Sequence, residues 1–416
     1  MKEVPALLRL VCLILMLATA GPAMAAGPLK IGFSLALTGG LASGGRQILA
    51  AIELWRDDIN ARGGLLGRPV VLDFYDDQSN PANVPAIYTK IIEVDKADLV
   101  VGPYGTPLVA PAIPIVMRHD MVTIGILALA ANAHFHYSKF FDMLPVGQTP
   151  KRALSAGFFA VAAQAAPKPR TLAIIAADSE FSKNTADGAR ANAKAAGFEI
   201  VYDKSYPASL GDFGPILRAV KAIGPDILYV AAYPPDTVGI VRAASEIGMT
   251  PKIFGGNMIG LTITPLKIQL GPLLNRIVNT DIFLPAPSFN FPGVADVLRR
   301  YQARAAREGL DPLGYGFVPF GYAAMQVLGE AVARTNSLDA DKLAAYIGAH
   351  RFATVAGEIA FGKNGEWKQS RIITTQFQHV ASHSLEEFKD PTKHVILWPP
   401  ALKSGDLIYP YAVGHK

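Results

Sequence analysis

The sequence predicts an α/β protein made of two lobes, each a mostly parallel sheet flanked by helices. Apolar runs of strand length alternate with segments of helix length along most of the chain, as in parallel sheets built from βαβ units. A second such series begins near the middle of the chain. The length of 416 residues also exceeds that of one typical domain.

The first βαβ unit contains a loop suited to close approach of a ligand. An apolar strand over residues 30–37 leads into a loop of small residues at 38–45, and a helix follows that ends at Gly63-Gly64. The second strand, 69–75, ends on Asp76-Asp77. Adjacent strand residues point to opposite faces, so we expect these acids to bond to loops and cap them, in preference to forming a metal or acid–base pair.

Residues 1–25 have the features of a cleavable export signal. Lys2 and Arg9 precede an apolar run from residue 10 to 20, and Ala23-Met24-Ala25 is a small-x-small cleavage site. The run is short for a bilayer-spanning helix, so a retained anchor is the weaker alternative. The single cysteine, Cys12, lies inside this segment. We therefore expect a periplasmic protein, cleaved after Ala25, without disulfides or cysteine-ligated metal.

The remaining elements are expected in a regular order. Helices are predicted at 81–94, capped by Asn80, and at 107–119, 154–164, 184–196, 213–223, 237–247, 265–270, 294–308 and 321–333. Strands are predicted at 99–102, 121–129, 141–145, 171–176, 199–206, 227–232 and 252–254, and 277–284 is a return crossover. The turn-forming run Phe361-Gly-Lys-Asn-Gly365 predicts a hairpin between 358–361 and 372–379. The Pro- and aromatic-rich tail predicts an ordered strap over one lobe.

Composition excludes several classes of function. The chain is 50% apolar and 18% charged, which is typical of a well-folded globule. The formal charge is +5, but Lys and Arg are scattered singly, so we expect no nucleic-acid partner. After residue 25 no apolar run reaches the roughly 20 residues of a spanning helix.

Several spaced segments resemble one family. They are the run 32–64 with the following YDDQSNP, VGPYGT at 101–106, IIAADSEFS at 174–182, DILYVAAY at 226–233, FGGN at 254–257 and FGKNG at 361–365. Over residues 29–380 the chain is similar to bacterial periplasmic leucine/isoleucine/valine-type solute receptors, the substrate-binding proteins of ABC importers (type I periplasmic binding proteins). The resemblance implies two lobes joined by three crossovers that close on a small ligand. It also implies no enzymatic activity, no cofactor and no metal, with permease subunits as partners of a monomer.

The expected division of the chain follows from this resemblance. Residues 1–25 are the signal peptide, 27–146 with 282–354 form lobe 1, and 147–281 with 355–388 form lobe 2. The strap is 389–416.

The resemblance also implies a set of ligand-binding residues. In the family, the loop occupied here by Gly105-Thr106 offers a hydroxyl and backbone N–H groups to a ligand carboxylate, and a helix N-terminus favours an anion there. Thr106 also suits a helix cap, and the two roles are compatible. Tyr233 is expected as a cleft aromatic, the alternative being a core-edge tyrosine. The full expected set is Ser43, Gly44, Tyr104, Gly105, Thr106, Leu127, Ala128, Leu129, Phe181, Tyr233 and Asn257.

Three departures from the family pattern bear on the ligand. Leu129 stands where a hydroxyl is usual, and Phe181 where a tyrosine is common. Asn257 or Met258 falls near the position of the glutamate that pairs with a ligand ammonium, and no acid lies within 255–265. A buried ammonium without a carboxylate is costly. We therefore expect an aromatic or short hydrophobic carboxylate in preference to leucine.

Other interpretations have less support. The loop 38–45 has no GxGxxG spacing or P-loop lysine, which argues against nucleotide binding. His134 and His136 have only Asp142 as a nearby acid, so a metal site is disfavoured. No GxSxG, HExxH or cysteine nucleophile indicates a hydrolase. The main competitor is a ligand sensor or regulator of the same fold, for amides or amino acids. A receptor's extracellular half would need a membrane span or signalling domain, which we do not find before Lys416.

Overall fold

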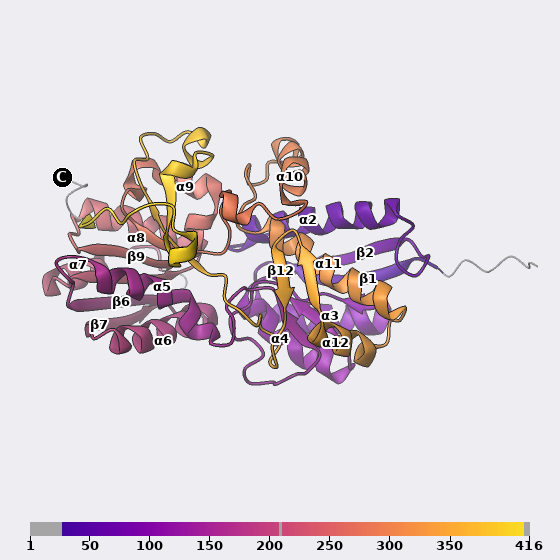
Figure 1. Ribbon diagram of the computed structural model, residues 1–416. Coiled ribbons are helices and arrows are strands. Elements are labelled where there is room, and N and C mark those ends of the chain that lie inside the picture. Colours follow the sequence, from indigo (N-terminus) through magenta and orange to yellow (C-terminus); the bar gives the residue numbers. More distant parts are fainter. Residues whose placement is uncertain (1–26, 208–209, 412–416) are drawn as a thin grey trace, which may run out of the picture.

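The computed structural model describes residues 27–207 and 210–411, which form two α/β lobes joined by crossing segments (Figure 1). The predicted signal peptide lies outside the described residues. Among the described residues, no helix is both long and apolar enough to cross a bilayer. The predicted fold class is confirmed.

Lobe 1 is built on a short parallel sheet. Strand β1 (Leu29–Leu35) lies between β2 (Val70–Asp76) and β3 (Leu99–Val100). Strands β4 (Thr123–Gly125) and β5 (Phe140–Asp142) form a parallel pair, and the Gly102 N–H donates to the Ile124 carbonyl at 2.8 Å, so the pair continues the sheet. The helices are α2 (Ala42–Ala61), α3 (Val84–Thr89), α4 (Thr106–Arg118), α10 (Val294–Glu308), α11 (Val318–Thr335) and α12 (Ala340–Ala349).

Lobe 2 contains a seven-stranded sheet of order β14-β13-β10-β9-β8-β6-β7. Its parallel strands are β6 (Thr171–Ala177), β7 (Glu199–Tyr206), β8 (Ile227–Ala232), β9 (Ile253–Met258) and β10 (Val278–Asp281). Its helices are α5 (Pro150–Gln164), α6 (Glu180–Ala195), α7 (Gly214–Ile223), α8 (Pro234–Glu246) and α9 (Thr264–Leu270). Separate apolar clusters cover the two faces, which is why β8 is buried along its whole length.

Local signals at the end of β2 are confirmed by hydrogen bonds. The Asn80 side chain accepts from the Ala82 N–H at the start of a 3₁₀ turn (Pro81–Asn83) that leads into α3 and a π-helical turn (Lys90–Val94). Asp76 accepts from the N–H groups of Leu37 and Thr38. Asp77 is fully buried and accepts from the hydroxyl of Ser34 and the N–H of Ser79. The loop-bonding role of the paired acids is therefore the one observed.

The long strand expected over 121–129 is wrong beyond residue 125. Leu127 and Ala130 have φ of 56° and 55°, a left-handed conformation that ends the strand. The run is still buried, because it passes between the lobes as a loop. An unalternating apolar run does not distinguish a buried strand from such a loop.

The hairpin expected around residues 361–365 is also wrong. Strand β12 (Gly357–Ala360) pairs with β11 (Arg351–Thr354), which precedes it. Strand β13 (Ile373–Phe377) instead joins the lobe 2 sheet, antiparallel to β10 and β14. The turn at 362–365 closes only an isolated bridge between Phe361 and Trp367. The local turn chemistry was read correctly, but the strand after it crosses to the other lobe.

The C-terminal segment forms part of the lobe 2 sheet. Residues of β14 (His394–Trp398) pair with β13 at one edge. Gln376 of β13 donates from its side-chain amide to the Ile408 carbonyl, and its amide oxygen accepts from the Ile408 N–H. Figure 1 shows this segment running along the outside of lobe 2.

Candidate functional site

A cavity lies between the lobes, where several strands end. Loops after β3, β4, β6, β8, β9 and β10 all reach it, as expected for ligand sites at the carboxyl ends of parallel strands. Its lining comprises Tyr104, Gly105, Leu127, Leu144, Leu154, Phe181, Tyr233, Asn257, Ile259, Thr262, Thr280, Asp281, Ile282, Gly316 and Phe317. The cavity volume is about 50 Å³. In this conformation the site therefore has room for one or two water molecules.

Six of the eleven residues expected from sequence line this one cavity: Tyr104, Gly105, Leu127, Phe181, Tyr233 and Asn257. The structure brings these six residues together. Contact with a ligand stays a prediction for all eleven.

The N-terminus of α4 forms one wall of the cavity. Gly105 precedes the helix with φ 87° and ψ 150°, a conformation essentially restricted to glycine. A Cβ placed on Gly105 would lie 3.9 Å from the Tyr233 hydroxyl, so the backbone of lobe 1 and the aromatic ring of lobe 2 face each other here. The Gly105 N–H donates to the Ile126 carbonyl, and the Leu108 and Val109 N–H groups donate to the Gly105 carbonyl. Pro107 has no N–H, so the Thr106 N–H and the helix dipole are what favour an anion at this helix start.

Two polar side-chain atoms in the cavity have no hydrogen-bond partner among the described residues. The Tyr233 hydroxyl and the Asn257 side-chain oxygen are both buried and unpartnered. Burial raises the pKa of Tyr233 well above its usual value, so its hydroxyl stays protonated and can donate. The Tyr233 ring packs against Phe181 at 5.3 Å between centroids. An unpartnered buried polar group is costly, which makes these two atoms candidates for ligand contact.

Asp281 is a lining residue that the sequence reasoning missed. It lies at the end of β10 and is 4% exposed. Its carboxylate accepts from the Thr375 hydroxyl at 2.7 Å, and His394 lies 3.3 Å away. The expected position for an acid was near the end of β9, within residues 255–265, and Asp281 lies at the end of the neighbouring strand β10. A lone acid within the apolar crossover 277–284 was the signal that could have found it.

Thr106, Ala128 and Leu129 lie behind the cavity wall. The Thr106 hydroxyl is fully buried and accepts from the Leu129 N–H at 2.8 Å. The Leu129 carbonyl in turn accepts from the Asn184 amide of α6 at 3.3 Å, which links the two lobes. The Ala128 N–H donates to Asp142, and burial raises the pKa of this carboxyl well above its usual value. These contacts hold the loop that carries Leu127.

Ser43 and Gly44 were expected nearest the ligand, and neither lines this cavity. A Cβ on Gly44 would lie 2.7 Å from the Tyr104 ring and 3.2 Å from the Phe317 ring, so Gly44 supports the two rings that do. Ser43 lines a wider opening of about 630 Å³, which Arg46 also borders. The opening lies between α2 in lobe 1 and the start of α8 in lobe 2.

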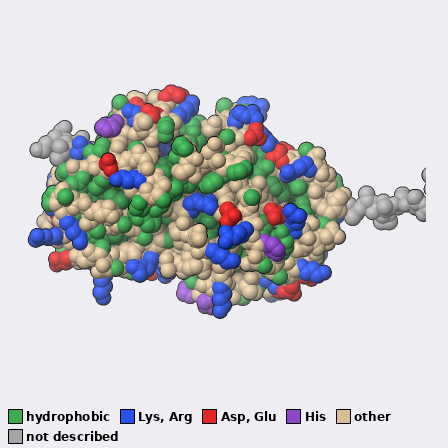
Figure 2. All heavy atoms as spheres, in the orientation of Figure 1, with side chains coloured by type: hydrophobic (Ala, Val, Ile, Leu, Met, Phe, Trp, Pro, Cys, Tyr) green, Lys and Arg blue, Asp and Glu red, His purple; other side chains and the backbone are tan. Residues whose placement is uncertain are grey.

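Charged and metal-binding side chains are distributed as follows. On the face shown in Figure 2, basic side chains are interspersed with acidic and uncharged ones. In the described part of the chain, no group of three His, Cys, Asp or Glu residues is placed to hold a metal ion, and this includes His134 and His136.

Comparisons with known proteins agree with this geometry. A family model described as periplasmic binding protein matches residues 28–378. An amino acid binding protein of Pseudomonas aeruginosa is 25% identical over 346 residues, covering 82% of this chain and 87% of that protein. A leucine binding protein of Thermotoga maritima has a TM-score of 0.74 at 18% identity, covering 85% and 96% of the two chains.

A further solved structure is similar. It is an ABC transporter solute binding protein of Rhodopseudomonas palustris in complex with 3,4-dihydroxy benzoic acid, with a TM-score of 0.71 at 20% identity, covering 85% and 94% of the two chains. With most of its length matched by the family model, the chain belongs to the periplasmic binding protein family, the non-enzymatic solute-binding proteins of ABC transporters.

Proposed function

We propose that the cleft binds a small solute with a carboxylate group and a mainly apolar body. One observation carries the proposal. The α4 N-terminus and the unpartnered polar atoms of Tyr233 and Asn257 meet in a cavity otherwise lined mostly by apolar and aromatic groups. A helix N-terminus and the Tyr233 phenol suit a carboxylate, and the apolar lining suits an aliphatic or aromatic body. The Asn257 side-chain oxygen can only accept, so it suits an N–H or O–H group of the ligand.

Binding requires the lobes to separate. A cavity of about 50 Å³ is far smaller than the roughly 300–1,000 Å³ of ligand pockets, so the ligand enters an open form through the opening beside Ser43. Closure about the crossovers then removes water and strengthens the polar contacts. Contacts such as Asn184 to the Leu129 carbonyl belong to the closed form.

The similar proteins support a carboxylate ligand and do not distinguish an amino acid from a carboxylate without an ammonium group. The printed names include a leucine binding protein and a protein in complex with 3,4-dihydroxy benzoic acid, both of them receptors for carboxylates. These names fit the expectation of a hydrophobic carboxylate and leave open the presence of an ammonium group.

The cellular setting is also a proposal. We infer that the chain is exported to the periplasm, cleaved after Ala25, and delivers its ligand as a monomer to the permease subunits of an ABC importer. We propose the lobe boundaries expected from the sequence, except that the last crossover lies at residues 361–372 and not at 354–355, because β12 pairs with β11 and β13 pairs with β10. The ligand sensor of the same fold is the second candidate, and the export-type N-terminus argues against it.

A thermal-shift screen of residues 26–416 tests the ligand class. A ligand that binds only the folded state raises Tm. We expect leucine, phenylalanine, 4-methylpentanoate or benzoate to raise Tm, and the matched neutral amides 4-methylpentanamide and benzamide not to do so. Stabilisation by the amides but by none of the carboxylates would refute the proposal.

A further inference from the structure

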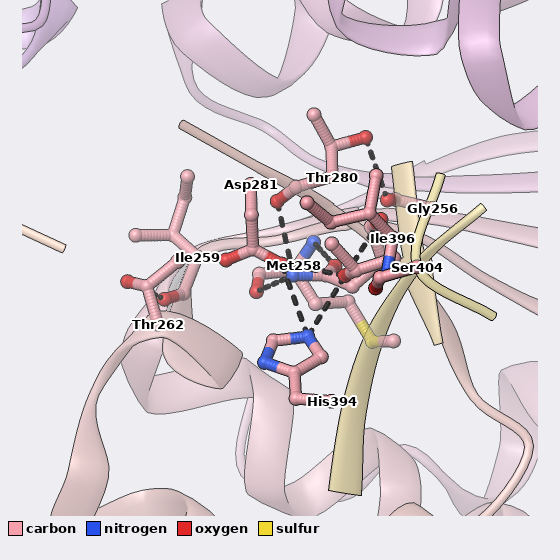
Figure 3. A network of polar contacts seen from close by, with 11 residues as sticks. Gly256, Met258, Ile259, Thr262, Thr280, Asp281, His394, Ile396 and Ser404 are labelled. Carbon is pink, nitrogen blue, oxygen red and sulfur yellow. Dashed lines mark hydrogen bonds and ion pairs between the residues drawn. The ribbon is translucent and has the colours of Figure 1, made fainter. Parts of the chain in front are cut away.

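Asp281 has two hydrogen-bonding neighbours on the side away from the ligand cavity. Figure 3 shows it between His394 on one side and Ile259 and Thr262, two cavity residues, on the other. The Thr375 hydroxyl lies 2.7 Å from Oδ2 of Asp281, and Nε2 of His394 lies 3.3 Å from the same oxygen. Among the described residues, no hydrogen bond reaches the other oxygen, Oδ1.

The proton positions in this cluster follow from the donors present. Thr375 has one hydroxyl proton, and its shorter contact is to Asp281. Nε2 of His394 lies 2.8 Å from the Thr375 oxygen, so this nitrogen carries a proton and donates. The ring also stacks on Phe377, with centroids 3.9 Å apart and planes 14° apart, which fixes its orientation. Both neighbours of Asp281 are therefore donors that hold one carboxylate oxygen.

The negative charge of Asp281 is not cancelled by an adjacent cation. Burial lowers the pKa of His394, so the ring is a neutral donor near pH 7. Lys267 is buried nearby and its charge acts on both groups, but no ion pair joins it to Asp281. A fixed carboxylate with a free oxygen in the wall of an apolar cavity suits a cationic group of a ligand.

His394 comes from a part of the chain that the family model does not cover. The match ends at residue 378, and β14 begins at His394. The strand places this side chain behind Asp281 by pairing with β13. The C-terminal segment thus contributes to the architecture of the ligand site.

We propose that Asp281 receives the ammonium group of a hydrophobic α-amino acid, and that His394 is a positioning residue that holds the Asp281 carboxylate for this contact. The inference rests on the proposed function, because the ligand carboxylate would bind at the α4 N-terminus. It corrects the preference for ligands without an ammonium group, which was based on the absence of an acid near the end of β9.

The test compares each amino acid with its counterpart that lacks the amino group. Leucine and 4-methylpentanoate form one pair, and phenylalanine and 3-phenylpropanoate form another. By calorimetric titration, the wild-type chain should bind an amino acid more tightly than its counterpart. Asp281→Asn should weaken amino-acid binding about 10- to 100-fold, the loss expected for a charged buried contact, and leave the counterpart unchanged.

Variants of His394 distinguish a role in positioning Asp281 from a role in the stability of the fold. His394→Phe keeps the stacking on Phe377 and removes the donor, so the preference for the amino acid should shrink. His394→Gln keeps a donor and should restore part of that preference. His350→Phe is the matched control, because His350 stacks on Tyr346 at 3.9 Å and does not line the cavity, and it should change neither affinity. A general loss of stability would weaken both members of a pair equally.

The outcomes distinguish the two proposals. Equal or tighter binding of the counterparts by the wild-type chain would overturn the role of Asp281 and leave the carboxylate site standing. An unchanged preference in His394→Phe would overturn the positioning role. Binding of no carboxylate at all would overturn both.

Discussion

Replacing Tyr233 by Phe should change stability and affinity in opposite directions. The substitution removes one hydroxyl, which is buried and has no hydrogen-bond partner among the described residues. The ring and its 5.3 Å contact with Phe181 are retained. If a tyrosine hydroxyl holds the fold together, removing it lowers the free energy of unfolding. If the hydroxyl serves only to contact a ligand, removing it does not lower that free energy.

The magnitudes follow from the two states of the hydroxyl. An unsatisfied buried polar group costs about 1–3 kcal/mol, so the free energy of unfolding of ligand-free Tyr233→Phe should rise by up to that amount. A hydrogen bond to a charged carboxylate contributes about 1.5–3 kcal/mol, which corresponds to a loss of affinity of roughly 10- to 150-fold.

Urea unfolding of the ligand-free protein measures the first quantity, and calorimetric titration with leucine or benzoate measures the second. Tyr229→Phe is the control, since Tyr229 is a fully buried tyrosine of β8 that does not line the cavity. Its affinity should equal that of the wild type. Loss of stability in Tyr233→Phe together with unchanged affinity would refute the reasoning.

Three further substitutions test particular features. Burial raises the pKa of Asp77 to about 6, so the folded state binds this proton more tightly and stability falls as pH rises from about 4 to 6. Asp77→Asn should remove that loss and add at most about 3 kcal/mol at pH 7, as measured by urea unfolding at several pH values. Gly105→Ala should cost about 1–3 kcal/mol of stability because of its φ of 87°, and its methyl group should weaken binding in titrations. Gly44→Ala places a methyl group 2.7 Å from the Tyr104 ring, and we expect about 1–3 kcal/mol of strain in thermal unfolding and weaker ligand binding without any direct ligand contact.

The fold could be predicted from sequence wherever local patterns decide the structure. A strand was expected at 199–206 and is found with those bounds, because the residues of the segment themselves favour a strand. The destination of a strand is not encoded locally. The segment 372–379 follows a good hairpin turn, yet its residues Ile373–Phe377 pair with β10, nearly 100 positions earlier. Pairing at that distance is decided by the assembled sheet.

The site was predictable to a similar extent. Strand ends and the segments after them predicted six lining residues, because parallel strands place their carboxyl ends together: Tyr104, Gly105, Leu127, Phe181, Tyr233 and Asn257. The packing of side chains around the cavity could not be predicted from the sequence. Gly44 lies beneath the Tyr104 ring, a relation that no sequence pattern reports.

Asp281 shows the same limit for polar groups. Its role depends on His394, over 100 residues later in the chain, and only the folded sheet brings the two within 3.3 Å.

The central claim, that the lobes close on a carboxylate solute, is tested most directly by the distance between them. The only cysteine lies in the predicted signal, so Lys342→Cys and Lys204→Cys in the mature chain give one exposed label on α12 and one on β7. Energy transfer between two dyes on these positions should change in a saturable way on addition of leucine or benzoate, and benzamide should have no effect. Binding of the carboxylate without any change in transfer, or a change induced equally by the amide, would contradict the account.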